Sequence, residues 1–169
     1  HGANTVLTLA QDGMTDYGIV IAQNADKRIV TASEELAHFL TTMTRAKFEV
    51  RHDDTPVSDF EIVLGETNRK MLEDVPPAVR PKTWEGFVIL SEGDKLFIIG
   101  GQIPRGTLYG VYDFLERELG VRFLAPEVTH VPRRSTLQVA VPDRVFDPAI
   151  ACAPYPCEYV IVSGSVGHA

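Results

Sequence analysis

The sequence predicts an α/β sandwich in which a mixed β-sheet of about seven strands carries two main helices. Three observations lead to this fold class. Short runs of β-branched and aromatic residues recur along the chain, two longer segments repeat apolar residues every three or four positions, and glycine or proline separates most of them. The predicted order is strands, helix, strands, hairpin, helix, strand, which is typical of a mixed sheet covered by helices.

The first two predicted strands are residues 5–10 (TVLTLA) and 17–22 (YGIVIA). Between them, Asp12 and Gly13 form a dipeptide that is typical of the two-residue turn joining antiparallel strands. We therefore expect these two strands to pair with each other as a hairpin.

Residues 25–44 have the periodicity of an amphipathic helix. The apolar side chains on its predicted buried face are Ile29, Ala32, Leu36, Phe39, Leu40 and Met43. Asn24 or Asp26 is suited to cap the N-terminus, because both side chains accept hydrogen bonds from free helix N–H groups. We expect Glu34 and Glu35 on the opposite face, in water.

Four further segments are predicted strands. Residues 47–51 alternate in polarity like a half-buried strand, and residues 60–65 form a more apolar run that ends at a glycine. After a stretch interrupted by prolines, with room for one helical turn, residues 86–91 and 95–99 flank a short turn that contains glycine. This last pair has the signature of a β-hairpin.

The second helix is predicted for residues 104–119. Gly100 and Gly101 end the preceding strand, and Pro104 fits the first helical turn because its missing N–H would have no partner there. Gly120 is suited to end the helix in the left-handed conformation. The apolar face of this helix consists of Leu108, Val111, Tyr112, Leu115 and Leu119.

The last predicted strands are residues 121–124 and, after a loop with several prolines, an edge strand at 135–141. From about Phe146 the chain is rich in small residues and proline and carries almost no charge. We therefore predict one α/β domain at residues 1–145 and a tail or linker at residues 146–169.

Composition argues against several classes of partner. The chain has 169 residues with 44% hydrophobic content, enough for one core, and its 16 Lys and Arg against 23 Asp and Glu give a net charge of -7. An acidic chain is repelled by nucleic acid and by anionic membranes. No apolar run reaches the length of about 18 residues that spans a bilayer. We expect no nucleic-acid partner and no membrane span.

The two ends of the chain bear on its compartment. The sequence opens without a methionine, which fits removal of a secretory signal, so we expect a secreted, periplasmic or cell-surface protein. Cys152 and Cys157 are two free thiols or one local disulfide, because their spacing lacks the second pair that a structural zinc site needs. The strand-like residues 158–163 offer a strand edge that could pair with a second copy of the chain. We therefore expect part of the protein to form a homodimer.

Several segments together resemble a known family of domains. They are "ASEELAHFLTTMT" at 32–44, "LGETNR" at 64–69 and the long segment 85–132, in which "RGTLYGVYDFLE" followed by "LGVRFLAP" is the most specific part. Over roughly residues 5–145, the chain resembles the N-terminal accessory domain that precedes the catalytic barrel of α-glucuronidase-like glycoside hydrolases. Relatives of that domain occur in β-N-acetylhexosaminidases and in large secreted bacterial proteins.

The resemblance implies an α/β sandwich and places the catalytic carboxylates in the barrel that follows. It implies a non-catalytic accessory domain of a secreted glycoside hydrolase that processes polysaccharide, with the catalytic barrel or a carbohydrate as its partner. Residues 148–152 depart from the family pattern, which leaves open a truncation, an altered reading frame or a free-standing domain. In the last case, the alternative function is a glycan- or uronate-binding module.

The candidate ligand-binding residues are Arg105, Gly106 and Trp84. Arg105 and Gly106 lie where the second helix begins, and a helix N-terminus attracts anions such as a sugar carboxylate or a phosphate. The alternatives for Arg105 are an ion pair with a nearby acid such as Glu116 or Asp113, or exposure to water. Trp84 lies in a loop before a strand, where an exposed indole stacks on a sugar ring.

We assign no catalytic residue, no metal ligand and no cofactor. The glycines within residues 100–106 lack the lysine and the spacing of nucleotide-binding loops. Asp113 and Glu116 share the side of the helix left over by the apolar face, so we expect them in water rather than in a catalytic pair. The histidines are scattered along the sequence and lack the spacing of a metal site, namely His38, His52, His130 and His168.

Overall fold

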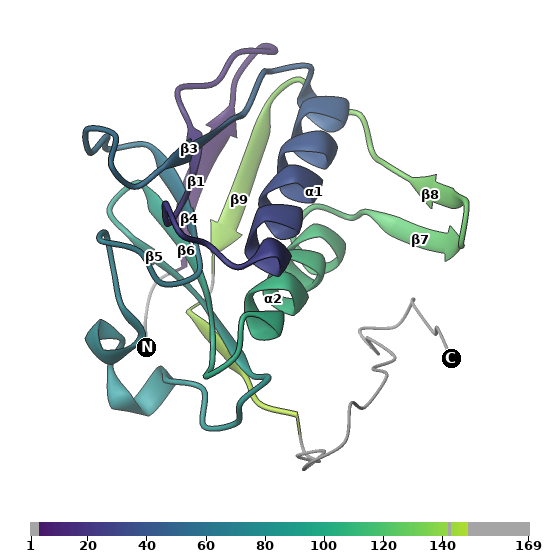
Figure 1. Ribbon diagram of the computed structural model, residues 1–169. Coiled ribbons are helices and arrows are strands. Elements are labelled where there is room, and N and C mark those ends of the chain that lie inside the picture. The colour runs from purple at the N-terminus through teal and green to yellow at the C-terminus, as the bar shows by residue number, and fades with distance from the viewer. Residues whose placement is uncertain (1–3, 142, 149–169) are drawn as a thin grey trace.

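The computed structural model describes residues 4–141 and 143–148 (Figure 1). They form a central six-stranded sheet with two helices on one face and an irregular segment on the other. Two smaller two-stranded sheets complete the fold. This architecture confirms the predicted α/β class, with six strands in the main sheet where about seven were expected. Within the described residues, no helix is long and apolar enough to cross a membrane.

The main sheet has the strand order β10-β5-β6-β4-β2-β3. Its strands, in chain order, are β2 (Gly18–Ile21), β3 (Glu49–His52), β4 (Glu61–Leu64), β5 (Phe87–Glu92), β6 (Lys95–Gly100) and β10 (Arg144–Phe146). Strands β3, β2, β4 and β6 run parallel to one another, and β5 pairs antiparallel with both β6 and β10. The predicted hairpin is therefore confirmed as β5 and β6.

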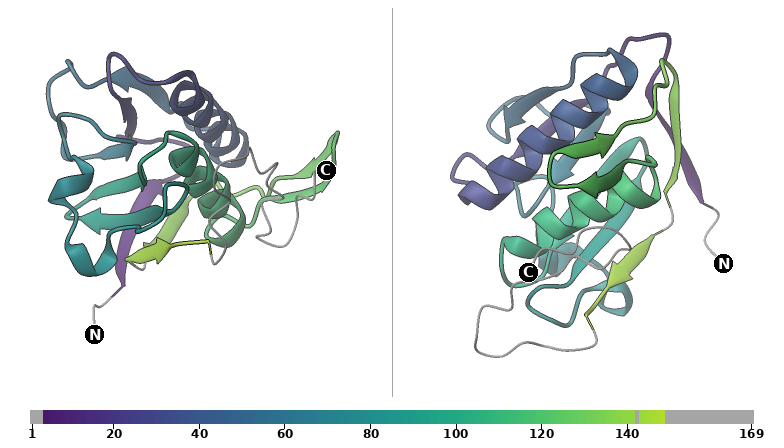
Figure 2. Two further views of the ribbon diagram at one scale, coloured as in Figure 1. Left: turned by 60° about the horizontal axis from the view of Figure 1, so that its bottom comes forward. Right: turned by 90° about the vertical axis from the view of Figure 1, so that its right-hand side faces the viewer.

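Both helices lie on the same face of the sheet and pack against each other (Figures 1 and 2). Helix α1 (Lys27–Thr44) begins at Asp26, whose carboxylate accepts a hydrogen bond from the Arg28 N–H, as predicted for a cap. Helix α2 (Arg105–Arg117) follows β6 closely, and Gly120 beyond its end has the predicted left-handed conformation, with a φ of 73°. The helical residues fully buried in this core include Ala32, Leu36, Leu40, Met43, Val111, Phe114 and Leu115.

The opposite face of the sheet is covered without a long helix. The segment between β4 and β5 crosses it and contains two short 3₁₀ helices, η1 (Leu72–Asp74) and η2 (Pro77–Val79). Apolar side chains of this segment pack on a second, smaller core contributed by the sheet, namely Val20, Val63, Val88, Leu90, Phe97 and Ile99. Burial on both faces explains why β2 and β4 are continuous apolar runs rather than alternating ones.

The partner of the first strand, β1 (Thr5–Ala10), corrects the sequence prediction. It pairs antiparallel with β9 (Leu137–Val141), from the far end of the described chain, and not with β2. The turn at Asp12 and Gly13 does form, with φ angles of 50° and 75°, but β2 then enters the main sheet. Turn chemistry sets only the local reversal, whereas burial of one face of the β1–β9 ribbon in the helix-side core decides which strands pair.

A second ribbon stands away from the body of the domain (Figure 1). It consists of β7 (Arg122–Ala125) and β8 (Val128–His130), paired antiparallel. Sequence reasoning predicts the strand at 121–124, which is confirmed, but it places β8 in a loop. The pairing of β8 depends on the neighbouring strand rather than on its own pattern, since its three residues are all exposed.

The C-terminal strand β10 extends the main sheet to Phe146 and was not expected from the sequence. Residues 149–169, which contain Cys152, Cys157 and the segment 158–163, lie outside the described residues. The division of the chain at residue 145 therefore stays a prediction.

Candidate functional site

The predicted site at the start of α2 is a tightly closed region, which we call the glycine corner (residues 83–86 and 100–107). The Gly101 N–H donates a hydrogen bond to the Gly86 carbonyl at 2.7 Å. A β-carbon on Gly106 would collide with the same Gly86 oxygen. Glycine is therefore required at position 106 by the approach of two backbone segments.

The backbone groups at the first turn of α2 already have hydrogen-bond partners within the chain. The Gly100 N–H donates to the Thr107 hydroxyl at 2.9 Å, and a β-carbon on Gly100 would lie 2.5 Å from the Thr107 nitrogen. The N–H groups of Gly106 and Thr107 donate to the carbonyls of Ile103 and Pro104. The backbone of β6 thus lies against the end of the helix where an anion would approach.

The structure brings the three predicted ligand-binding residues to this corner. Arg105 forms an ion pair with Glu85 at 3.2 Å, and not with the acids of its own helix. The Trp84 carbonyl accepts a hydrogen bond from the Ile103 N–H at 3.2 Å, while the residue as a whole is 65% exposed. Ligand binding by Arg105, Gly106 and Trp84 stays a prediction.

Asp147 fastens the loop that leads into the glycine corner. Its carboxylate accepts hydrogen bonds from the Lys82 N–H at 2.8 Å, the Thr83 N–H at 3.0 Å and the Thr83 hydroxyl at 2.9 Å. Burial by itself would raise the pKa of Asp147, but these donors and the Lys82 charge outweigh burial and lower the pKa. The end of the described chain is thereby tied to the corner.

Asp113 and Glu116 contradict the expectation that they lie in water. They are 5% and 4% exposed. The Asp113 carboxylate pairs with Arg117 at 2.9 Å and with Arg144, which reaches it from β10. Burial raises the pKa of Asp113, and the two arginines offset this only in part. The sequence could not show this burial, because the covering strand comes from a distant part of the chain.

A second buried charged group lies on the opposite face of the sheet. Glu61 pairs with Arg69 at 3.0 Å and with Lys95 at 3.4 Å. Burial by itself would raise the pKa of Glu61, but hydrogen bonds from Arg69 and Ser58 and the charges of Arg69 and Lys95 lower it. The Arg69 guanidinium also donates to the Thr55 carbonyl at 2.9 Å, so this group ties two loops to the sheet.

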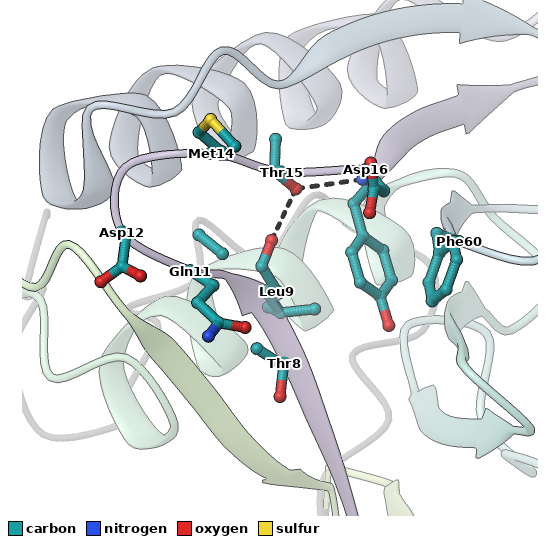
Figure 3. A pocket seen from close by; sticks show the side chains of 10 residues that line it. Thr8, Leu9, Gln11, Asp12, Met14, Thr15, Asp16 and Phe60 are labelled. Carbon is teal, nitrogen blue, oxygen red and sulfur yellow. Dashed lines mark hydrogen bonds between the residues drawn. The ribbon is translucent and has the colours of Figure 1, made fainter.

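A pocket opens at the fork where β1 and β2 separate (Figure 3). We call it the fork pocket. Its volume of about 500 Å³ lies within the usual range of small-ligand sites. It is lined by Thr8, Leu9, Ala10, Gln11, Asp12, Met14, Thr15, Asp16, Tyr17 and Phe60.

Hydrogen bonds hold the turn that borders the fork pocket. Gln11 and Met14 exchange backbone hydrogen bonds at 2.8 and 2.9 Å. The Thr15 hydroxyl donates to the Leu9 carbonyl at 2.6 Å and accepts from the Tyr17 N–H at 3.0 Å, as the dashed lines in Figure 3 show. These hydrogen bonds fix the turn on one side of the pocket.

Two aromatic rings form one wall of the fork pocket. Tyr17 and Phe60 meet edge to face, with their centroids 5.5 Å apart. The Tyr17 hydroxyl donates to the Asp94 carbonyl at 2.6 Å, and burial together with the Asp94 charge raises the pKa of Tyr17 to about 12. Phe60 is 36% exposed, and its ring contributes apolar surface at the mouth.

The polar side chains of the fork pocket are carboxylates, hydroxyls and one amide, and none of the ten lining residues is Lys, Arg or His. Asp12 and Asp16 are both exposed. Within residues 4–141 and 143–148, no group of three His, Cys, Asp or Glu side chains is arranged to hold a metal ion.

Sequence reasoning missed the fork pocket. It recognises the turn at Asp12 and Gly13 but takes the flanking strands as paired, which would fill the space. The available signal is the presence of Asp12 and Asp16 on either side of one turn, and it is too common to indicate a site. Phe60 joins the pocket from a segment that is remote in sequence.

Comparison with known families gives a direct match. Residues 10–114, more than half of the chain, match the model described as the glycosyl hydrolase family 67 N-terminus. The chain belongs to this family. The matched range contains both helical segments up to Phe114, the glycine corner and the fork pocket except for Thr8 and Leu9, and it confirms the resemblance found in the sequence. No curated protein matches the sequence.

Three solved structures of glycoside hydrolases are similar to this chain at low identity. A family GH115 4-O-methyl-alpha-glucuronidase with specificity for decorated arabinogalactans has a TM-score of 0.50 and 17% identity, over 78% of this chain and 17% of that chain. The chitobiase of Flavobacterium johnsoniae has a TM-score of 0.40 and 15% identity, over 83% and 20%. A GH138 enzyme targeting pectin rhamnogalacturonan II has a TM-score of 0.40 and 19% identity, over 60% and 10%.

This chain is much shorter than the three solved structures. The chain spans between 10% and 20% of the length of these three solved structures. At the identity of 17% the glucuronidase supports the fold alone. The family match is what ties the chain to glycoside hydrolases.

Proposed function

We propose that this chain is a non-catalytic accessory domain of a secreted glycoside hydrolase, which packs against the catalytic domain and assists the processing of a polysaccharide. The family match supports the glycoside hydrolase context. The small share of the related structures that the chain covers is consistent with one domain among several.

One observation carries the non-catalytic part of the proposal. Hydrolysis of a glycosidic bond needs two carboxyl groups that face each other across the bond, one of them kept protonated by apolar surroundings. Of the three buried carboxylates in the described residues, Asp113 and Glu61 are each paired with two cations, and Glu116 is not without a partner either. The carboxylates at the fork pocket, Asp12 and Asp16, are exposed.

The alternative function, a free-standing glycan- or uronate-binding module, shares the fold and differs in having no catalytic partner. Its uronate form needs a cation that is free to bind a carboxylate. Arg105 is the candidate for that role, and its pairing with Glu85 competes with such a ligand. We therefore favour the accessory domain.

The test is sugar release by the purified chain from glucuronoxylan, arabinogalactan and chito-oligosaccharides, with an active α-glucuronidase as the positive control. We expect no release above the buffer blank. Release that is abolished in Asp12→Asn or Asp16→Asn would overturn the proposal, because both exposed side chains can be changed without disturbing the core.

A further inference from the structure

We propose that the fork pocket binds an uncharged sugar residue of a polysaccharide. This inference rests on the proposed function, since it names the ligand that an accessory domain would hold for its catalytic partner. It concerns a different region from the glycine corner, where the sequence places its ligand-binding candidates.

The shape of the fork pocket favours a ligand held by a preformed site. The turn between β1 and β2 is closed by hydrogen bonds within itself, and the Gly13 N–H also donates to the Ser135 carbonyl at 2.9 Å. The Asp12 N–H donates to the Thr136 hydroxyl at 3.1 Å, which ties the turn to the segment before β9. A pocket of about 500 Å³ that is fixed before binding avoids the entropic cost of ordering a loop.

The polar groups of the pocket match hydroxyl groups. The carboxylates of Asp12 and Asp16 accept hydrogen bonds, and the Gln11 amide both donates and accepts. No hydrogen bond or ion pair occupies the Asp16 side chain within the described residues. Hydrogen bonds from a ligand hydroxyl to a carboxylate are stronger than those between neutral groups.

The apolar groups of the pocket match the C–H face of a sugar ring. Phe60 presents an exposed ring next to Tyr17, and Met14 is 74% exposed. Figure 3 shows Thr8 and Gln11 on one side of the pocket and Phe60 on the other. A ring bound between them would have its apolar face on Phe60 and its hydroxyls toward the polar side.

Charge selects among sugars. The absence of Lys, Arg and His from the ten lining residues, together with the two aspartates, repels a uronate carboxylate. The net charge of -7 adds to this repulsion at long range. The pocket therefore favours uncharged sugars over uronic acids, which separates it from the uronate site that a glucuronidase context would suggest.

The experiment titrates the ¹⁵N-labelled chain with xylohexaose, a linear galactan hexamer and cellohexaose, and in parallel with trigalacturonate. We expect at least one uncharged oligosaccharide to shift the amide signals of residues 8–17 and 60 at millimolar concentration. Trigalacturonate should leave these signals unchanged, because the two aspartates of the pocket repel its carboxylates.

Two variants test the two sides of the pocket. Asp16→Ala and Phe60→Ala should each weaken binding about tenfold, the loss expected when one charge-assisted hydrogen bond or one packing surface is removed. The matched controls are Asp54→Ala, an exposed aspartate outside the pocket, and Leu124→Ala on the β7–β8 ribbon. Both controls should bind like the unchanged chain.

Three results overturn the inference: no shift at residues 8–17 with any uncharged oligosaccharide, tighter binding of trigalacturonate than of the uncharged sugars, or equal loss in the controls. Each of them leaves the accessory role intact, because that role is tested by sugar release. Because Asp16 is exposed, we expect Asp16→Ala to keep the fold. The binding test therefore does not depend on whether Phe60→Ala is stable.

Discussion

The glycine corner and the fork are both places where a strand ends at a turn with glycine, and they differ in how closely the backbone packs. At the corner, a β-carbon on Gly106 would strike the Gly86 carbonyl. At the fork, the nearest atom to a β-carbon on Gly13 is the Thr44 oxygen, at an ordinary contact distance of 3.7 Å. The corner is closed by the protein itself, whereas the fork leaves a pocket.

The difference teaches how a glycine-rich sequence should be interpreted. Glycine makes room for a close neighbour, and that neighbour is either a ligand or another part of the chain. The clustered glycines at residues 100–106 make room for the chain. Gly13, in a much less conspicuous sequence, supplies only a left-handed φ and borders the open space.

The largest expected change in the free energy of unfolding is that of Gly106→Ala in the glycine corner. Helix propensity alone predicts that Gly106→Ala stabilises the protein by about 1 kcal/mol. The collision with the Gly86 carbonyl reverses the sign, and we expect a loss of about 3 kcal/mol, because two backbone segments must move apart. Urea unfolding followed by circular dichroism measures the difference.

Gly13→Ala is the matched change at the fork. It has space for the methyl group and carries only the cost of a left-handed φ, about 1 kcal/mol. If both variants lose the same free energy of unfolding, or if Gly106→Ala is more stable than the unchanged chain, the close backbone contact between Gly106 and Gly86 is contradicted.

An intermediate effect is expected at the loop that supports the corner. Because the pKa of Asp147 is lowered in the folded protein, its contribution is present above the usual value of 3.8 and is lost as the pH falls through the lowered value. Asp147→Asn removes the charge and should cost about 1 kcal/mol at pH 7, a figure reduced for its partial exposure.

The measurement for Asp147 is the difference in unfolding free energy between the unchanged chain and Asp147→Asn as a function of pH. The difference should shrink below pH 3.8. Asp54→Asn, an exposed aspartate elsewhere, should show no such trend. A constant difference across this range would contradict the charge-assisted hydrogen bonds to Lys82 and Thr83.

The smallest effect is expected at the exposed edge of the corner. Trp84→Ala should change the free energy of unfolding by less than about 0.5 kcal/mol, because the residue is largely in water and its backbone hydrogen bond is kept. The same variant tests the predicted role of Trp84 in sugar binding. Unchanged retention on immobilised polysaccharide would remove Trp84 from the candidates and leave the fork pocket.

The elements predicted correctly are those whose signals are local. The periodicity of α1, its cap at Asp26, the hairpin of β5 and β6, and the stop at Gly120 all depend on residues within one element or one turn. These patterns act through hydrogen bonds and burial that the neighbouring sequence already determines.

The elements predicted wrongly depend on remote partners. β1 pairs with a strand more than 120 residues away, and its apparent hairpin with β2 is not formed. Asp113 is buried because Arg144 covers it from β10. For the same reason the fork pocket could not be predicted, since it exists only because β1 and β2 part and Phe60 arrives from another loop.

The pairing of Thr5 with Val141 also has a consequence for biosynthesis. During synthesis β1 must wait for β9, more than 120 residues later, before the two strands can pair, and an unpaired edge invites association with other chains. A fragment ending at residue 114, where the family match ends, would keep α1, lose the last residues of α2 and leave β1 without its partner β9.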